Sequence, residues 1–151
     1  MDVSTSLRIV ELPYEERSLL HSLNQTIFGD TQVIRTFERT DLMMLVAWLR
    51  GTPVGFKVGY QLQPRTFYSA KGGVLPKVRR RGIARALLHA MLDRVRERDY
   101  RRFVFDTFPN MHPGMTILAL NEGFQVVQAG YNTEHSDYRL RFAHLFPSNG
   151  E

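Results

Sequence analysis

The segment covering residues 67–92 is the feature of this sequence that most limits its fold. An apolar, strand-like run at residues 67–75 ends at Pro76 and passes through a basic, glycine-containing turn directly into an amphipathic helix. The first turn of a helix carries N–H groups without intrahelical partners and about half a positive charge. A strand, a basic glycine turn and a helix start in direct succession therefore predict a site for a phosphate-bearing ligand.

The composition limits the class of protein further. The 151 residues, 43% of them apolar and 23% charged, predict one globular domain over residues 1–151. Cysteine is absent, which excludes disulfides, thiol nucleophiles and cysteine-ligated metal sites. Residues 1–4 lack the features of a leader peptide, and the longest apolar run, residues 42–49, is too short to cross a bilayer. We therefore expect a cytoplasmic protein with no membrane partner.

The positive charge of the chain is concentrated in one region. Ten of the twenty basic residues lie between Lys77 and Arg102, and the formal net charge is +5. Such a cluster can attract nucleic acid, an acidic membrane or a polyanionic cofactor, or it can be a solvated helix face. We expect no exposed aromatic residues interleaved with these bases, and no nucleic-acid-binding motif accompanies them, so nucleic acid is a less favoured partner.

The spacing of apolar residues predicts the order of the elements. Strands are expected at residues 6–12, 42–49, 54–62, 67–75, 102–107, 124–131 and 136–142, and helices at 13–28, 33–39, 83–99 and 115–121. The helix between the fourth and fifth strands would make them a parallel pair. The fold class is therefore α/β (α+β), with a mixed, mainly antiparallel sheet of about seven strands, about four helices and one central parallel β-α-β crossover.

Two blocks of the sequence carry a resemblance to a known family. The first combines Gly73-Val74-Leu75-Pro76 with the spacing Arg79-x-x-Gly82-x-Ala84. The second has Asn110 followed by a short helical stretch that ends in Gly123-Phe124. With the order of elements, these blocks resemble the GCN5-related N-acetyltransferase (GNAT) superfamily. The resemblance is specific over residues 67–131 and is one of topology over the first 60 or so.

The resemblance implies acetyl-coenzyme A as cosubstrate and no metal, and the five histidines show no metal-binding spacing. Gly82 would let the backbone approach the diphosphate, with N–H groups of about residues 80–85 directed at its oxygens. One or two arginines would contact phosphate, while residues 73–75 would pair with the pantetheine arm. Asn110 would contact that arm or cap its own loop. The expected cofactor-binding set is Gly73, Val74, Leu75, Arg79, Arg80, Arg81, Gly82, Ile83, Ala84, Arg85 and Asn110.

The reaction that the resemblance implies is direct attack of an amine on the thioester, with the carbonyl polarised by the backbone N–H of Val74. Many relatives carry a tyrosine as general acid where this chain has Ala119. Asp106 and Glu122 are candidate bases, although both are candidates for ordinary ion pairs. Further candidates for the missing acid are Asn121, Tyr131 and Tyr138, and His112 is the histidine with most chance of facing the site.

The acceptor is expected to contact the connection at residues 28–41 and the turn at residues 132–136. These segments contain Asp30, Glu38, Asp41 and Glu134, which would suit a cationic amine of a small molecule or peptide. The alternative functions are a coenzyme A-binding protein with lost or altered catalysis and, less favoured, a basic nucleic-acid-binding module. A homodimer is a further possibility, because dimers are common among GNAT proteins.

Overall fold

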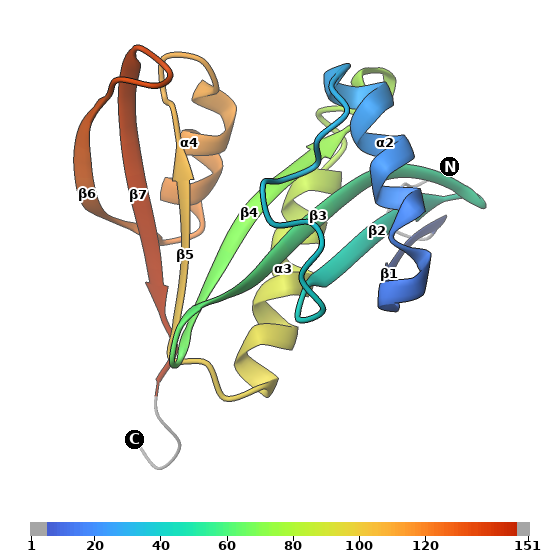
Figure 1. Cartoon of the computed structure of the whole chain (residues 1–151), viewed down its shortest axis with the longest axis horizontal. Helices are drawn as coiled ribbons and strands as arrows, with labels where there is room; N and C mark the ends of the chain where they lie inside the picture. The colour runs from blue at the N-terminus through green and yellow to red at the C-terminus, as the bar shows by residue number, and fades with distance from the viewer. Residues whose placement is uncertain (1–5, 148–151) are drawn as a thin grey trace. The chain divides into compact units, whose positions relative to one another are not determined.

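The computed structural model describes residues 6–147, and its secondary structure follows the predicted order (Figure 1). The helices are α2 (Ser18–Phe28), α3 (Ile83–Glu97) and α4 (Pro113–Asn121), with 3-10 turns η1 (Tyr14–Glu16) and η2 (Pro76–Val78). The strands are β1 (Leu7–Glu11), β2 (Met43–Leu49), β3 (Thr52–Gln63), β4 (Thr66–Val74), β5 (Arg102–Thr107), β6 (Gln125–Asn132) and β7 (Asp137–Leu145). Residues 1–4, which the sequence analysis finds unlike a leader peptide, lie outside the described residues.

The topology confirms the predicted sheet. The seven strands follow the order β1-β2-β3-β4-β5-β7-β6. The first residues of β4 pair in parallel with β5, and the pairs β1–β2, β2–β3, β5–β7 and β6–β7 are antiparallel. Helix α3 connects β4 to β5, so the expected parallel crossover is present. None of the helices within residues 6–147 is long and apolar enough to cross a membrane.

The prediction for the helices needs two corrections. Residues 33–39, expected to be helical, form turns instead, with the N–H of Arg39 donating to the carbonyl of Thr36 at 3.0 Å. So short a segment gains too few hydrogen bonds to offset helix nucleation, and burial of Val33 holds it to the core instead. The helix expected from Pro13 begins as the 3-10 turn η1 and becomes α-helical only at Ser18. The described residues thus contain three α-helices.

The described chain divides into two units, residues 6–60 with 70–94, and residues 61–69 with 95–147. A single domain over residues 1–151 stays a prediction. In the first unit, α2 covers one face of the antiparallel strands β1, β2 and β3. Its Leu20 and Leu23 pack into a core with Val46 on β2 and Phe56 and Val58 on β3. These positions alternate along the strands, so burial of one face fixes the register.

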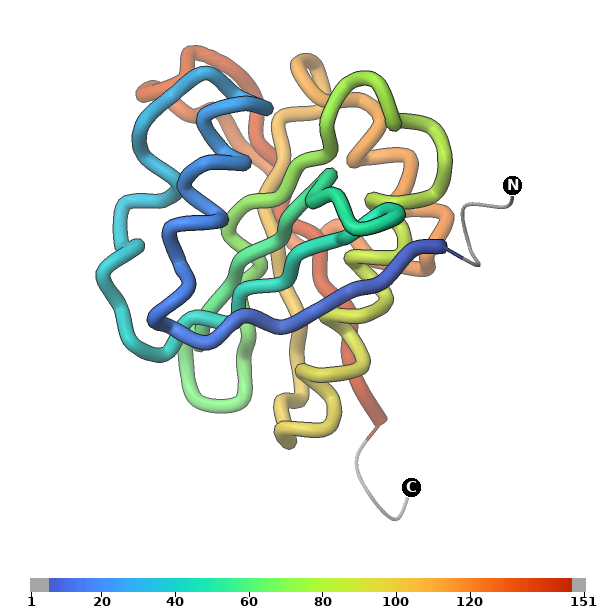
Figure 2. The backbone as a smooth tube through the Cα atoms, turned by 90° about the vertical axis from the view of Figure 1, so that its right-hand side faces the viewer, coloured from blue at the N-terminus to red at the C-terminus, as the bar shows by residue number. Residues whose placement is uncertain are grey.

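Helix α3 covers the other face of the first unit, and Figure 2 shows α2 and α3 on either side of the strands. A side chain at Gly55 of β3 would lie 3.4 Å from Leu87 of α3 and 2.9 Å from the carbonyl oxygen of Gly73. The predicted apolar stripe of α3 is buried, with Ile83 and Leu87 each 2% exposed. Glycine at position 55 is therefore required by close packing between β3, β4 and α3.

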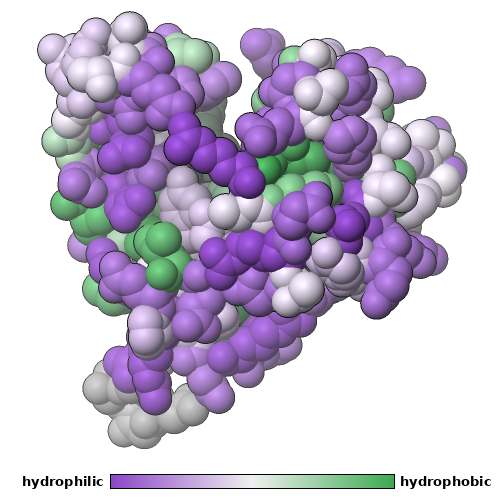
Figure 3. All heavy atoms as spheres, in the orientation of Figure 1, coloured by the Kyte–Doolittle hydropathy of each residue, from purple (hydrophilic) through white to green (hydrophobic). Residues whose placement is uncertain are grey.

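The second unit contains an aromatic core. Phe124 packs edge-on against Phe103 and Phe105 of β5, and Phe105 stacks on Phe142 of β7 at 5.5 Å between ring centroids. At the end of the strand order, β6 pairs only with β7, and seven of its eight residues are exposed. In Figure 3 small hydrophobic patches lie over β6 and the strands beside it. The core of this unit therefore lies on the phenylalanine face of β5 and β7.

Candidate functional site

The end of β4 is shaped by close contact with α2. A side chain at Gly73 would lie 2.8 Å from two ring atoms of Phe28 and 3.0 Å from Ile27. Gly73 is thus required by the packing of α2 against the strand end. Val74 next to it is buried, and the N–H of Leu75 donates to the carbonyl oxygen of Val54 at 2.8 Å. The last residues of β4 are therefore held rigidly by α2 on one side and by β3 on the other.

The turn that follows adopts an unusual backbone conformation. Arg80 has a φ of 64° and Gly82 a φ of 81°, both in the left-handed region. Glycine takes this conformation without steric cost, whereas residues with a side chain rarely do. A side chain at Gly82 would meet no atom within 4 Å. Glycine is thus favoured here by its backbone conformation, and open space lies beside it.

Several backbone N–H groups of this turn have no backbone acceptor. Among residues 6–147, no backbone carbonyl accepts a hydrogen bond from the N–H of Arg80, Arg81 or Gly82. The carbonyl oxygen of Gly82 accepts the N–H of Ala86 at 3.0 Å, so α3 begins here and its first N–H groups lack intrahelical partners. No acidic residue lies in the first turn of α3. Donors and helix dipole together favour an anion at this position.

The arginines of the turn divide into two kinds. The Nε of Arg79 donates to the carbonyl oxygen of Val74 at 3.0 Å and so ties the turn back to the end of β4. Arg80, Arg81 and Arg85 are exposed, and so is Arg79 apart from this hydrogen bond. Ile83 is buried in the core, and the exposed Ala84 adds no bulk beside the turn. That one or two of these arginines contact phosphate stays a prediction.

Asp106, in the second unit, is held by basic neighbours. Its two carboxylate oxygens accept hydrogen bonds from the Nε and Nη2 of Arg141 at 2.8 and 3.0 Å. The hydroxyl of Tyr68 donates to it at 3.2 Å, and Nη1 of Arg139 lies at 3.9 Å. The hydrogen bond with Asp106 raises the pKa of Arg141. These contacts favour a structural ion pair for Asp106 over the role of a base.

The other candidates in the second unit lie on or near α4. Asn121 is its exposed last residue, and Glu122 is its C-cap. Ala119, at the position of the family's tyrosine, is fully buried, and the exposed His112 is the N-cap. Among the described residues, the hydroxyl of Thr116 in the same helix is buried without a hydrogen-bond partner. The sequence analysis did not single out Thr116, because nothing in its local pattern distinguishes a buried hydroxyl.

The remaining candidates of this unit are engaged with their neighbours. The side-chain amide of Asn110 donates to Asp137 at 3.0 Å, and this bond lowers the pKa of Asp137. Tyr131 and Tyr138 are exposed and pack against one another, with ring centroids 5.2 Å apart. Asn110 therefore fixes its loop to the start of β7, which is the loop-capping alternative of the sequence analysis. A contact between Asn110 and a ligand stays a prediction.

The acidic residues expected to attract a cationic acceptor are paired. Asp30 accepts a hydrogen bond from Asn24 at 2.9 Å, which lowers its pKa, and lies 3.5 Å from the Nζ of Lys71. Glu38 lies 3.5 Å from Arg17. Arg39 binds Asp41 through two hydrogen bonds and thereby lowers the pKa of that carboxyl group. In the connection at residues 28–41, each of these three carboxylates is thus close to a basic side chain that compensates its charge.

One residue of this region was missed by the sequence analysis. The Nζ of Lys71 lies 4.5 Å from the ring centroid of Phe28, the same ring that contacts Gly73. Lys71 precedes Gly73 by two residues, so the two positions share one face of β4. This alternation is the signal by which Lys71 could have been found. The described residues contain no group of histidines, cysteines and acids that could hold a metal ion.

The sequence was also compared with models of known protein families. A model of the acetyltransferase (GNAT) family matches residues 8–116. The chain belongs to the GNAT acetyltransferase family. A search of curated proteins gave no match to the sequence.

Solved structures of GNAT proteins share the fold of this GNAT chain. An IAA acetyltransferase from Bacillus cereus ATCC 14579 has a TM-score of 0.80 at 18% identity, covering 93% of this chain and 100% of that one. A ribosomal-protein-S18-alanine N-acetyltransferase from Escherichia coli has a TM-score of 0.80 at 16% identity, covering 96% and 97%. A GNAT family acetyltransferase from Elizabethkingia anophelis, with acetyl-CoA bound, has a TM-score of 0.76 at 16% identity, covering 93% and 99%. At these identities the matches show the fold alone.

Proposed function

We propose that this GNAT chain is an acetyl-CoA-dependent N-acetyltransferase that acts on a primary amine of a small molecule or peptide in a ternary complex. The observation that carries the proposal is the row of backbone N–H groups at residues 80–82, which runs into the N-terminus of α3. This row, the positive helix end and three exposed arginines fit the diphosphate of coenzyme A. Membership of the family supports the donor, and the acceptor class rests on the family's chemistry.

The residues of the first unit have distinct roles in this proposal. N–H groups of residues 80–85 bind the diphosphate, and Arg80, Arg81 and Arg85 supply charge. The backbone of Gly73 and Val74 pairs with the pantetheine amides, whereas Leu75 flanks the arm, because its N–H donates to Val54 and its carbonyl oxygen accepts the N–H of Val78. The N–H of Val74 is the donor that polarises the thioester carbonyl, where negative charge develops as the amine attacks. The rigid contacts of β4 with Phe28 and Arg79 keep this donor in place.

The reaction moves one proton and one acyl group. The amine nitrogen forms a bond to the carbonyl carbon, the carbon–sulfur bond breaks, and the sulfur leaves with the bonding electron pair. The amine must lose a proton, and Glu122 is the candidate base in this proposal because the carboxylate of Asp106 is held by Arg141. Asn121 is a candidate to donate a hydrogen bond to the leaving sulfur. With Ala119 in place of a tyrosine, the sulfur leaves as thiolate. A thiol pKa of about 8.5 makes this cost roughly 2 kcal/mol at pH 7.

A second candidate function is coenzyme A binding without acetyl transfer. The fully buried Ala119 favours it, because the position that holds the acid in many relatives has no acidic group here. Nucleic-acid binding is less favoured by the structure of the basic cluster. Arg79 donates to Val74, and Arg94 lies 3.3 Å from Glu11, so these cations are directed at the protein itself.

One experiment separates the two functions. The protein is mixed with acetyl-CoA and a panel of primary amines, and free thiol is measured beside calorimetric binding of acetyl-CoA. We expect micromolar binding and amine-dependent thiol release. Binding without thiol release on any amine would favour the second function, and absence of binding would refute both. Affinity for arbitrary duplex DNA that falls steeply with salt would instead indicate a nucleic-acid-binding module.

A further inference from the structure

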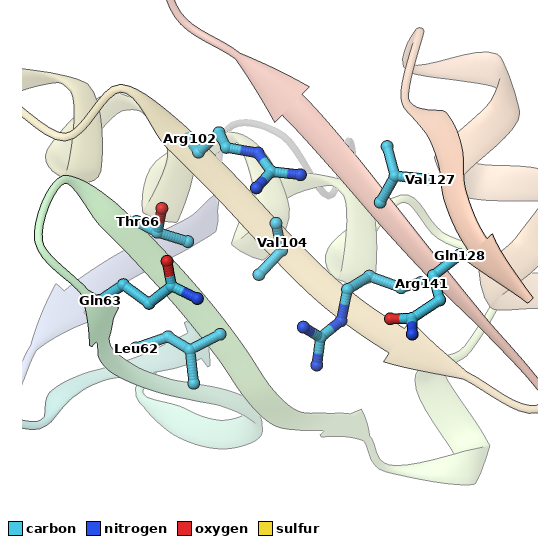
Figure 4. A pocket seen from close by; sticks show the side chains of 8 residues that line it. All are labelled: Leu62, Gln63, Thr66, Arg102, Val104, Val127, Gln128 and Arg141. Carbon is cyan, nitrogen blue, oxygen red and sulfur yellow. The ribbon is translucent and has the colours of Figure 1, made fainter.

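The sheet of the second unit has a hollow on the face opposite its phenylalanine core. The hollow has a volume of about 310 Å³ and is lined by side chains from the end of β3, the start of β4, and β5, β6 and β7. Along β5, Phe103 and Phe105 point into the core, so Arg102 and Val104 point to this opposite face. Figure 4 shows the side chains directed from these strands toward the space above Val104.

The walls of the hollow are rich in hydrogen-bond donors. The guanidinium groups of Arg102 and Arg141 line it, together with the amides of Gln63 and Gln128 and the hydroxyl of Thr66. No carboxylate is among its lining residues. An arginine presents its N–H groups as a planar fork that matches a carboxylate or phosphate. The donor set therefore suits an anionic group.

The charge of the lining is close to that of one cation. Arg141 forms two hydrogen bonds with Asp106, which lies on the same face of β5 as Arg102 and Val104, so the charge of Arg141 is compensated. Within residues 6–147, no carboxylate lies at ion-pairing distance from Arg102. The lining thus has one uncompensated positive charge, that of Arg102. A single charge favours a singly charged carboxylate over a phosphate dianion.

Apolar side chains complete the hollow. Val104 forms the floor and is 1% exposed, while Leu62 and Val127 at the rim are 38% and 46% exposed. Binding of a ligand that removes exposed aliphatic side chains from water is favoured by the burial of their apolar surface. A purely inorganic anion would leave them exposed. The ligand should therefore have an apolar body beside its charged group.

We propose that this hollow binds a small organic carboxylate, with the carboxylate at Arg102 and the apolar body over Val104 between Leu62 and Val127. The volume lies at the lower end of the range for ligand pockets, which is about 300 to 1,000 Å³, so a ligand with a single ring fits. None of the lining residues belongs to the donor-binding segment, residues 73–85. The site is therefore a second one, in addition to that for the acetyl donor.

Calorimetry on the full chain tests this site with benzoate as the probe. Benzyl alcohol and benzylamine have nearly the same shape but are neutral and cationic, and inorganic phosphate has the charge without the ring. We expect benzoate to bind with millimolar or tighter affinity, in the absence and in the presence of saturating coenzyme A, and the other three probes to bind at least about tenfold more weakly. Equal binding of benzylamine or phosphate would overturn the proposal.

Three variants locate the bound carboxylate. Arg102→Gln should weaken benzoate binding at least about tenfold, since it removes the uncompensated charge. Arg101→Gln changes the net charge equally at an exposed neighbour outside the hollow, and should leave the affinity unchanged. Val127→Asp places a carboxylate at the exposed rim, so it should abolish binding without disturbing the core. If benzoate bound Arg102→Gln or Val127→Asp as tightly as the unaltered chain, the proposed site would be wrong.

Discussion

The Nε of Arg79 donates a hydrogen bond to the carbonyl oxygen of Val74 at 3.0 Å, and so connects the basic turn to the end of β4. Arg79 is the first residue of the family spacing Arg79-x-x-Gly82-x-Ala84, in which charge suggests a contact with phosphate. Its observed partner is instead the residue whose N–H we propose as the donor to the thioester. Arg79 is therefore a positioning residue in the proposed mechanism.

This hydrogen bond allows a test that distinguishes a positioning role of Arg79 from binding of phosphate by its charge. Arg79→Met should raise the Kd for acetyl-CoA about five- to tenfold and lower kcat, because the turn and strand end lose a mutual hydrogen bond. The salt dependence of binding should stay as in the unaltered chain. Arg81→Met is the matched control, and should make binding less sensitive to salt. Titrations at low and high salt check both, and a weaker salt dependence in Arg79→Met would contradict the positioning role.

Gly82 lies in the proposed anion site, and Gly51 provides a matched control outside it. Both have a φ of 81°, and a side chain at either would meet no atom within 4 Å. Gly82→Val and Gly51→Val should each cost about 1 to 2 kcal/mol of stability through backbone strain. Only Gly82→Val should also raise the Kd for acetyl-CoA, at least tenfold. Denaturant unfolding and calorimetry measure the two effects, and an unchanged Kd in Gly82→Val would argue against the phosphate site.

Lys57 lies on the α3 side of β3 with 6% of its surface exposed, and burial lowers its pKa to about 8. Since its folded-state pKa is below its ordinary 10.5, the unfolded chain binds more protons between those values, and stability should rise with pH from about 8 to 10.5. Lys57→Met should therefore add about 3 kcal/mol at pH 7 and remove this pH dependence.

Denaturant unfolding at several pH values between 7 and 10.5 measures the effect of Lys57. The exposed Lys77 provides the control, and Lys77→Met should leave the stability at each pH nearly unchanged. A loss of stability in Lys57→Met at pH 7 would show that the ammonium group has favourable partners in the folded state.

Asp106 provides a test of structural against catalytic roles. Asp106→Asn leaves Arg141 and Arg139 without their shared carboxylate, and should cost about 2 to 4 kcal/mol of stability. The exposed pair of Arg39 and Asp41 is the control, because Asp41→Asn should cost less than about 1 kcal/mol. The pH profile of kcat/KM should keep its shape in Asp106→Asn. Loss of its acidic limb would instead identify Asp106 as the base.

The sequence by itself predicted the order of the elements, while the donor segment stays a prediction. The strand predicted at residues 102–107 coincides with β5, and the apolar spacing of α3 identified its buried face. Gly82, directly before α3, marked a turn and a helix start, and the structure adds that its φ is 81°. These features depend on residues that are close together in the chain, so local periodicity and turn chemistry suffice to predict them. The turns at residues 33–39 were mispredicted, because a segment so short depends on how Val33 meets the core.

Only the tertiary structure decided what the individual side chains do. Asp106 is separated by 35 residues from Arg141 and by 38 from Tyr68, and the strand register alone brings them into contact. The same holds for Gly73 against Phe28, and for the hollow above Val104, whose walls come from five strands. A sequence specifies where a strand or helix begins. The partners of a charged or polar side chain depend on the pairing of distant segments, and local pattern carries little information about that pairing.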